Sequence, residues 1–458
     1  MNLRDFSHAR SALLGAGREG QAAHAWLRRA YPLLPLTIVC ESPPDAGFVA
    51  TLGAADQLWV EPLTAKRLAQ FDILIRSPGI SLYRDPLQQA RASGVRITTP
   101  TSLWFAAHPN ARTLCVTGTK GKSTTTALVA HMLRSCGRTV RLAGNIGRAL
   151  LACPDEAVDW WVIELSSYQI ADLQAAPSIA LMLNLSPEHL DWHGGEQAYL
   201  RDKSRLVDLT LAGGGLAIIN AADPECASRF GHRQGIRRFN TEAGICALHD
   251  AVFEAGQRLP VVMPQGLFGA HNRSNVAAAL AAVAAAGGPV LQAAAAVETF
   301  QCLPHRLQVL GYWDGVRCIN DSIASTPLAT AAAMASLAGQ NVVLIVGGLD
   351  RGLDWSRYRE SFLQHLPKAV VAVPDSGQRI LGMLAEMQVN PPAGCHMAEG
   401  LDQAVHLAHS LCAAGDTLLL SPGAPSFPRF VDYQDRGQTF ARLCGLSNAA
   451  GNLAGLCG

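Results

Sequence analysis

Short apolar runs alternate with helix-forming segments over residues 1–106. The runs Ser11–Leu14, Leu36–Cys40 and Phe71–Arg76 each end at a glycine, a glutamate or a Ser-Pro-Gly turn. Strands that alternate with helices predict a parallel sheet covered by helices. We therefore predict a Rossmann-like N-terminal domain at residues 1–106.

A second α/β pattern follows at residues 107–304. The buried run Thr113–Thr117 precedes a glycine-rich loop, and Ser123–Cys136 carries apolar residues at helical spacing before Gly137. Further strands are predicted at Trp160–Ile163, Ile179–Leu185 and Gly215–Ile219. This region is expected to be a central domain with a parallel sheet.

The segment Cys302–Arg306 indicates a boundary to a third domain at residues 305–458. Strands are predicted there at Asn341–Val346, Ala369–Val373 and Asp416–Leu420, each ending in a turn. The fold class is therefore α/β in three domains, with a Rossmann-like C-terminal domain. Ligands of such sheets bind at the carboxyl ends of the strands.

The composition and charge of the chain argue against several classes of function. The formal net charge is +1, so no global positive field favours nucleic acid or an anionic membrane. The longest apolar stretch, Ala277–Ala296, is interrupted by Gly287-Gly288-Pro289 and predicts two helices instead of a membrane span. The 12 cysteines lack zinc spacing, and the N-terminus lacks a signal-peptide core. We expect a cytoplasmic protein that binds neither membrane nor nucleic acid.

The loop after Thr117 has the pattern of a shortened phosphate-binding loop. Its residues are Gly118, Thr119, Lys120, Gly121, Lys122 and Ser123. Glycines let backbone amides surround phosphate oxygens, Lys122 reaches the terminal phosphates, and Ser123 can bind Mg²⁺. The alternative is an ordinary glycine turn that precedes a helix.

A second glycine loop lies in the N-terminal domain. Gly15, Gly17 and Gly20 match the G-x-G-x-x-G pattern after a strand, and Glu41 follows about 20 residues later. The pattern fits a bound dinucleotide such as NAD, and it fits a nucleotide-sugar diphosphate better. The alternative is that Glu41 is a solvent-exposed residue at the end of a strand, without a role in binding.

Three polar residues, two near strand ends and one on a predicted helix, are candidates for metal binding or catalysis. Glu164 closes an apolar strand and is expected to face a metal. His189 follows another strand, and Lys203 lies on a predicted helix. Their ordinary alternatives are a surface acid, a structural histidine and a solvated lysine.

Taken together, these motifs resemble the Mur ligases. The resemblance rests on Thr117–Thr124, Gly144–Gly147, Glu164–Gln169, Asn184–Asp191, His271–Asn275, Leu303–Arg306, Asn320–Ser322 and Leu420–Pro422. The chain is most similar to the MurD branch, which adds glutamate to UDP-N-acetylmuramoyl-L-alanine. The resemblance implies an ATP-dependent amide ligase of peptidoglycan precursor synthesis that forms an acyl phosphate.

The resemblance also implies roles for matching residues. Catalytic roles fall to Lys122, His189 and Lys203, the last as a carbamate. ATP contacts fall to Gly118, Thr119, Lys120, Gly121, Lys122, Ser123, Thr124, Asn272, Asn275, Arg306 and Asp321. Mg²⁺ contacts fall to Ser123, Glu164, His189 and Lys203. The UDP-substrate contacts are Gly15, Gly17, Gly20, Ser77, Gly79 and Asn145, and the glutamate contacts are Ser325, Arg351, Ser426 and Tyr433.

One departure from the branch concerns the amino acid. Ile323 and Ser325 stand where many members of the branch have lysine and threonine. A smaller subgroup with a similar Gly-Arg-Glu-Gly loop adds L-glutamate, so we favour the L-isomer, with the D-isomer as the alternative. A P-loop kinase and a nucleotide-sensing module are the rival classes. We expect the protein to be a monomer.

Overall fold

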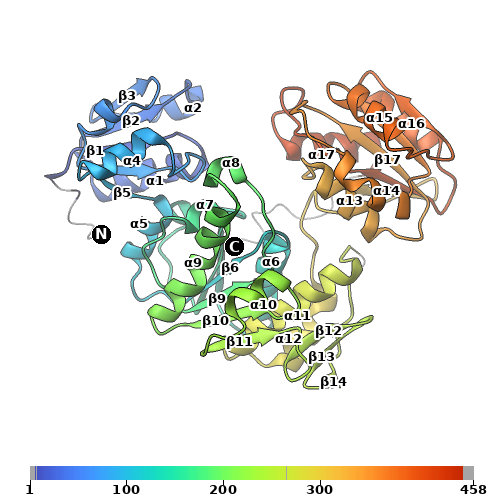
Figure 1. Ribbon diagram of the computed structural model, residues 1–458, viewed down its shortest axis with the longest axis horizontal. Helices are drawn as coiled ribbons and strands as arrows, with labels where there is room; N and C mark the ends of the chain where they lie inside the picture. Colours follow the sequence, from blue (N-terminus) through green and yellow to red (C-terminus); the bar gives the residue numbers. More distant parts are fainter. Residues whose placement is uncertain (1–5, 7, 265, 447–458) are drawn as a thin grey trace. The chain divides into compact units, whose positions relative to one another are not determined.

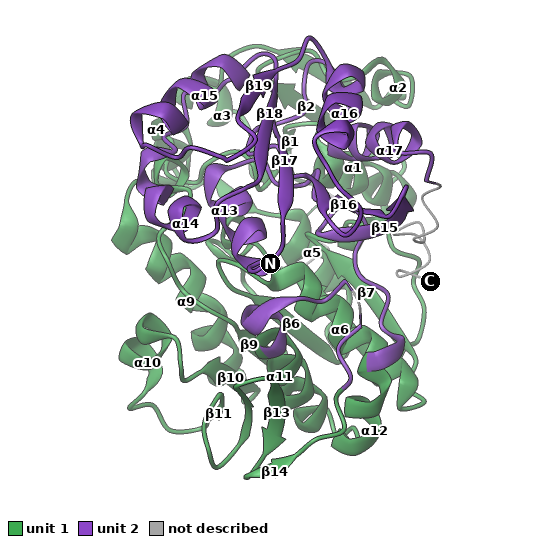
Figure 2. Cartoon of the chain, turned by 90° about the vertical axis from the view of Figure 1, so that its right-hand side faces the viewer, with its two compact units in different colours: residues 1–261, 274–297, 456–458 green, residues 262–273, 298–455 purple. Residues whose placement is uncertain are grey.

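The computed structural model describes Phe6, residues 8–264 and residues 266–446. The described residues form two compact units (Figure 2). The first contains the chain up to residue 261 together with residues 274–297, and the second contains residues 262–273 and the chain from residue 298. Three large sheets, each covered by helices, give the predicted α/β class (Figure 1).

The N-terminal sheet belongs to the first unit and is entirely parallel, in the order β3-β2-β1-β4-β5. Its strands are β1 (Ser11–Leu14), β2 (Leu36–Cys40), β3 (Asp56–Val60), β4 (Ile73–Arg76) and β5 (Arg96–Thr98), and its helices are α1 (Arg18–Ala30), α2 (Ala46–Val49), α3 (Ala65–Leu68) and α4 (Asp85–Ala92). The strand order reverses at β1. A ligand site is therefore expected at the carboxyl end of β1.

The central sheet, also in the first unit, is parallel in the order β11-β10-β9-β6-β8-β7. Its strands are β6 (Thr113–Thr117), β7 (Val140–Gly144), β8 (Trp160–Glu164), β9 (Ile179–Met182), β10 (Leu216–Asn220) and β11 (Ile236–Phe239). The helices of this part are α5 (Pro100–Ala107), α6 (Lys122–Ser135), α7 (Ser167–Ile170), α8 (Leu190–His193), α9 (Glu196–Ala212), α10 (Pro224–Phe230), α11 (Gly269–Ala285) and α12 (Val290–Ala295), with short 3-10 turns at Leu150–Ala152 and Ala296–Thr299. A small antiparallel sheet consists of β12 (Ile245–Leu248), β13 (Ala251–Glu254) and β14 (Gln257–Arg258).

The sheet of the second unit has the order β15-β16-β20-β17-β18-β19, with only β15 antiparallel to its neighbour. Its strands are β15 (Gln308–Trp313), β16 (Val316–Asn320), β17 (Val342–Gly347), β18 (Ala369–Val373), β19 (Cys395–Met397) and β20 (Thr417–Leu420). Its helices are α13 (Pro327–Ser336), α14 (Arg359–Gln364), α15 (Gly377–Glu386), α16 (Leu401–Ser410) and α17 (Tyr433–Leu443), with a 3-10 turn at Ser356–Tyr358. Aliphatic residues of β17, β18 and β20 fill the core on both faces.

The predicted strands β1, β2, β6 and β18 have the expected bounds. The sequence pattern does not predict β3, because the residues of this edge strand are partly exposed and polar. It also does not predict β5, which is short. The alanine-rich stretch forms two helices, α11 and α12, as predicted. Within the described part of the chain, no helix combines the length and the hydrophobicity needed to cross a membrane.

Candidate functional site

The phosphate-loop motif follows β6 in the middle of the central sheet and leads into α6. Gly121 precedes the helix with a φ of 82°, and a Cβ on it would lie 2.5 Å from Asn275 Oδ1. The Thr119 amide donates to Asn184 O at 3.0 Å, which ties the loop to the segment after β9. The predicted strand–loop–helix context is therefore present, and the left-handed backbone at Gly121 requires glycine.

Two lysine side chains converge on this loop. Lys122 Nζ donates to Gly118 O at 3.0 Å and to Thr119 O at 2.9 Å, and Lys203 Nζ donates to Gly118 O at 2.8 Å. Lys203 is 2% exposed on α9, and burial lowers its pKa well below the ordinary value, with Lys122 lowering it further. Lys203 is therefore not the solvated lysine of the ordinary alternative. The Lys122 ammonium suits a polyanionic ligand, whereas the buried Lys203 amine is placed against the same loop without the hydration of a surface lysine.

Glu164 ends β8 and is 1% exposed. Its Oε1 accepts a hydrogen bond from Asn145 Nδ2 at 2.7 Å, whereas Oε2 is buried without a hydrogen-bond partner. An unpaired buried carboxylate oxygen is unfavourable, and a cation would satisfy it. The residue is therefore suited to metal binding, and the alternative of a surface acid is wrong.

His189 precedes α8 with a φ of 57°. Burial is the main cause that lowers its pKa, against the opposing effect of Glu188, whose carboxylate lies 3.8 Å from His189 Nε2. A lowered pKa favours the neutral imidazole that binds metals. Among residues 6, 8–264 and 266–446, no three His, Cys, Asp or Glu side chains are grouped closely enough to hold a metal ion. A metal here would need other ligands, such as the half-buried Ser123 at the start of α6.

The second glycine loop follows β1, at the reversal of strand order. Gly15 has a φ of 85°, and its carbonyl accepts a hydrogen bond from Ser77 Oγ at 3.0 Å. No atom lies within 4 Å of a Cβ built on Gly17 or on Gly79, so space is left for a ligand beside the backbone. Glu41 is paired with Arg84, with oxygen–nitrogen distances of 2.6 and 2.7 Å. Arg84 lowers the pKa of Glu41, so the acid is held at the strand end as an ion pair.

Gly20→Ala is expected to lower the melting temperature of the protein. A Cβ on Gly20 would lie 2.1 Å from Gly15 O, and such overpacking costs about 1–3 kcal/mol. Thermal unfolding measures the effect. Gly17→Ala is the matched control, because that Cβ would meet open space, and its stability should change by less than about 0.5 kcal/mol. Equal losses in the two variants would contradict the packing argument.

Two residues of this loop have roles that the sequence analysis missed. The Arg18 guanidinium donates to Asn145 O at 2.9 Å and to Gly147 O at 3.1 Å. Glu19 accepts from Gln169 Nε2 at 2.5 Å, and burial raises the pKa of Glu19 to about 7. These bonds connect the second glycine loop to the segments that follow β7 and β8. The adjacent charged residues Arg18 and Glu19 within the glycine motif are the sequence feature that could have indicated these contacts.

In the second unit, Asp321 follows β16 and is buried. Burial raises its pKa to about 7, although it accepts hydrogen bonds from Ser421 Oγ at 2.8 Å and the Leu307 amide at 3.1 Å. Arg306 is half-buried, and its Nε has no hydrogen-bond partner. Asn272 Nδ2 donates to Phe268 O at 2.7 Å. Asn275 belongs to the first unit, whereas Asn272, Arg306 and Asp321 belong to the second.

A cavity of about 140 Å³ lies at the carboxyl ends of β17, β18 and β20 in the second unit. Of the four predicted glutamate contacts, Ser426 lines it, while Ser325, Arg351 and Tyr433 do not. Two arginines that the sequence analysis missed line it as well. Arg436 donates to Ser322 O at 2.8 Å, and burial lowers its pKa to about 10. Arg429 pairs with Asp375 at 3.2 Å.

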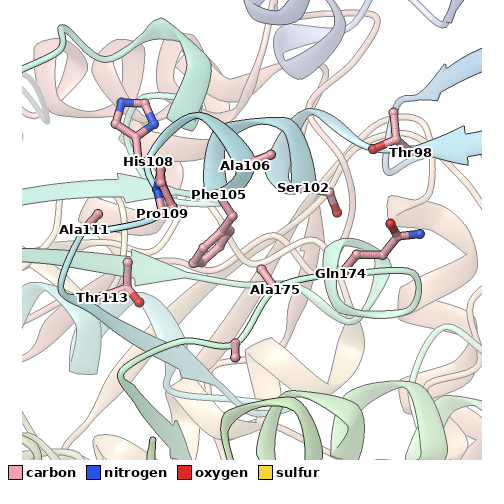
Figure 3. Close-up of a pocket in the computed structure, with 11 residues that line it drawn as sticks. Thr98, Ser102, Phe105, Ala106, His108, Pro109, Ala111, Thr113, Gln174 and Ala175 are labelled. Atoms are coloured by element: carbon pink, nitrogen blue, oxygen red, sulfur yellow. The ribbon is translucent and has the colours of Figure 1, made fainter. Parts of the chain in front are cut away.

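A larger cavity of about 290 Å³ lies elsewhere in the first unit (Figure 3). Its lining includes Phe105, His108, Thr113 and Gln174. Thr113 is the first residue of β6, whereas the phosphate loop follows Thr117 at the opposite end of the strand. This cavity therefore lies at the amino edge of the sheet and is not the site of the converging lysines.

Known proteins agree with this fold. A profile of the Mur ligase middle domain matches residues 116–283, and one of the Mur ligase glutamate ligase domain matches residues 305–423. The chain belongs to the Mur ligase family and is an ATP-dependent ligase.

Its curated relatives include two enzymes named UDP-N-acetylmuramoyl-L-alanine–L-glutamate ligase. The enzyme from Xanthomonas campestris pv. campestris is 45% identical over 96% of both chains, and that from Xylella fastidiosa is 43% identical over 97% of both. Among solved structures, Thermotoga maritima MurC matches with a TM-score of 0.59 and 19% identity, covering 95% of this chain and 99% of MurC. Thermotoga maritima MurF in complex with ADP matches with a TM-score of 0.60 and 14% identity, covering 95% of both chains. These structures support the fold.

Proposed function

We propose that this protein joins glutamate to UDP-N-acetylmuramoyl-L-alanine at the expense of ATP, in the synthesis of peptidoglycan precursors. The names of relatives that cover nearly the whole chain support this substrate pair. The observation that carries the proposal is the convergence of Lys122 and Lys203 on Gly118, near a buried Glu164 oxygen without a partner. We propose that the protein acts as a monomer in the cytoplasm.

The reaction requires an activated carboxyl group, because a carboxylate is a poor electrophile. A carboxylate oxygen of the substrate attacks the γ-phosphorus of ATP, and ADP leaves. The glutamate amine then attacks the acyl carbon, phosphate leaves, and the amine loses a proton. The first step brings two anions together, so Lys122 and the loop amides stabilise the charge that develops.

We propose that Mg²⁺ binds beside the phosphate loop. The ligands would be Ser123, Glu164, His189 and the carbamate form of Lys203. The unpaired Glu164 oxygen supports this set, since Mg²⁺ prefers oxygen ligands. The carbamate oxygens would add anionic oxygen ligands to those that Glu164 supplies. The bound ion would offset the negative charge of the phosphates.

We propose three domains, at residues 1–106, 107–304 and 305–458, which mainly bind the UDP-substrate, ATP and glutamate, in that order. The UDP-substrate would contact Gly15, Gly17, Gly20, Ser77, Gly79 and Asn145. ATP would contact the phosphate loop with Thr124, together with Asn272, Asn275, Arg306 and Asp321. The open space beside Gly17 and Gly79 supports the first set, and the left-handed Gly121 supports the loop.

We propose that glutamate binds in the C-terminal domain, at the cavity that contains Ser426. A dianionic amino acid needs donors for both carboxylates. Ser426 and Arg429 line the cavity, and Arg351 is an exposed guanidinium that follows β17. Ser325 and Tyr433 complete the proposed set. Arg429 extends it with a second cation.

The enzyme is expected to prefer L-glutamate over D-glutamate by a factor of ~10 or more in kcat/KM. Inverting the α-carbon moves one carboxylate away from its donors, and a lost hydrogen bond to a charged group costs about 1.5–3 kcal/mol. The names of the relatives support the L-isomer. Phosphate release, measured with each isomer and UDP-N-acetylmuramoyl-L-alanine, tests the preference. A preference for D-glutamate would contradict the isomer, and a preference for alanine or a diamino acid would contradict the glutamate site.

A further inference from the structure

A continuous chain of hydrogen bonds links the N-terminal sheet to the helix that carries Lys203. Tyr83, in the segment between β4 and α4, donates from its hydroxyl to both oxygens of Asp202, at 2.7 and 2.8 Å. Asp202 Oδ2 lies 2.6 Å from His193 Nδ1, and His193 Nε2 lies 3.0 Å from Ser167 Oγ. We call these four residues the Tyr83 network.

Donors and acceptors in the network match one another. A carboxylate only accepts, so the Asp202 carboxylate receives hydrogens from Tyr83 and from His193 Nδ1, and the Ser167 hydroxyl, which can donate or accept, pairs with His193 Nε2. Burial and the Asp202 carboxylate raise the pKa of Tyr83, which keeps its hydroxyl protonated as a donor. Every member of the network therefore has a partner.

The order Ser167, His193, Asp202 also resembles a nucleophilic triad. The His193 side chain is fully buried, and Ser167 is 3% exposed. None of the three residues lines either of the cavities described above. A nucleophile needs contact with its substrate, so the arrangement is suited to holding structure in place and not to attack on a substrate.

Two members of the network, Ser167 and Asp202, lie close in sequence to proposed metal ligands. Ser167 begins α7, three residues after Glu164, and Asp202 immediately precedes Lys203 on α9. Adjacent residues of a helix point about 100° apart, so Asp202 can be held by Tyr83 while Lys203 faces Gly118. A bond at Asp202 therefore fixes the rotation of α9, and with it the position of the lysine.

We propose that Tyr83 is a positioning residue for the ligation, which through Asp202 holds α9 so that Lys203 stays against the phosphate loop. The proposal rests on the proposed function, because it assigns Lys203 a role in that reaction. It makes the arrangement of the catalytic lysine depend on the segment that follows the predicted UDP-substrate contacts Ser77 and Gly79.

Tyr83→Phe tests the proposal. Without the hydroxyl, Asp202 loses one of its two donors, and small misplacements of a reacting group reduce rates strongly, so kcat should fall ~10-fold while both substrate KM values change less than about threefold. Tyr312→Phe is the matched control, because it removes the same hydroxyl from an exposed tyrosine on β15 that is not part of the network. Its kcat should remain within about twofold of the wild type.

A double-mutant comparison asks whether Tyr83 acts through Lys203. In Lys203→Ala enzyme assayed with acetate, adding Tyr83→Phe should reduce kcat by less than about twofold, because the group being positioned is gone. Hydrogen exchange of the α9 amides provides a measurement that needs no activity. Exchange should rise in Tyr83→Phe and not in Tyr312→Phe.

The outcomes separate the two proposals. Turnover of wild-type enzyme with UDP-N-acetylmuramoyl-L-alanine and glutamate tests the proposed function before any variant is compared. Unchanged kcat in Tyr83→Phe, equal losses in Tyr83→Phe and Tyr312→Phe, or equal losses with and without Lys203 would each overturn the positioning role. If acetate does not restore activity to Lys203→Ala, the hydrogen-exchange measurement decides. Unchanged exchange of the α9 amides in Tyr83→Phe would then overturn the positioning role.

Discussion

Lys122→Ala is expected to reduce phosphate release by a factor of ~100 or more, because removing one group that stabilises transition-state charge commonly has an effect of that size. Lys122 begins α6, and its amine lies within 3.0 Å of two carbonyls of the phosphate loop. Affinity for the UDP-substrate should stay nearly unchanged, because its proposed contacts belong to other segments. Phosphate release and equilibrium binding of the UDP-substrate measure the two quantities.

Lys66→Ala is the control for this prediction. Lys66 is an exposed lysine on α3, far along the chain from the phosphate loop, and its replacement should leave turnover unchanged. If the Lys122 variant kept more than about a tenth of wild-type turnover, the loop would not be the phosphate-binding group inferred from its geometry.

Lys203→Ala is expected to be inactive, and short carboxylic acids are expected to restore part of its activity. The carbamate of Lys203 would supply anionic oxygens to Mg²⁺, whereas a free ammonium group would repel the ion. Lys203 is buried beside the loop, so the alanine variant leaves space in which acetate can place its oxygens. Initial rates of phosphate release at increasing acetate concentration measure the recovery.

The matched variant is Lys203→Arg, whose guanidinium is positively charged and cannot form a carbamate. We expect it to be inactive with and without acetate, because the side chain still fills the space. Full activity of either variant without acetate would remove Lys203 from the mechanism.

Much of the fold followed from local sequence. Buried strands such as β1, β2 and β6 are uninterrupted apolar runs between turn residues, so their bounds were predictable. β3 was missed because an edge strand has exposed positions and carries polar residues there. The order of the strands within each sheet could also not be predicted from the sequence pattern, because strand pairing depends on contacts between distant segments.

The sequence by itself determined the phosphate-loop motif, the glycine loop after β1 and Glu164 at a strand end, because each has a local pattern. Only the tertiary structure decided what these residues contact. It brought Lys203 to Gly118, left one Glu164 oxygen without a partner, and placed Arg429 and Arg436 around the cavity with Ser426. It also joined Tyr83 to Asp202 across 119 positions of the chain. The physical reason is that hydrogen bonds and burial depend on distances in space, which a linear pattern of residue types does not contain.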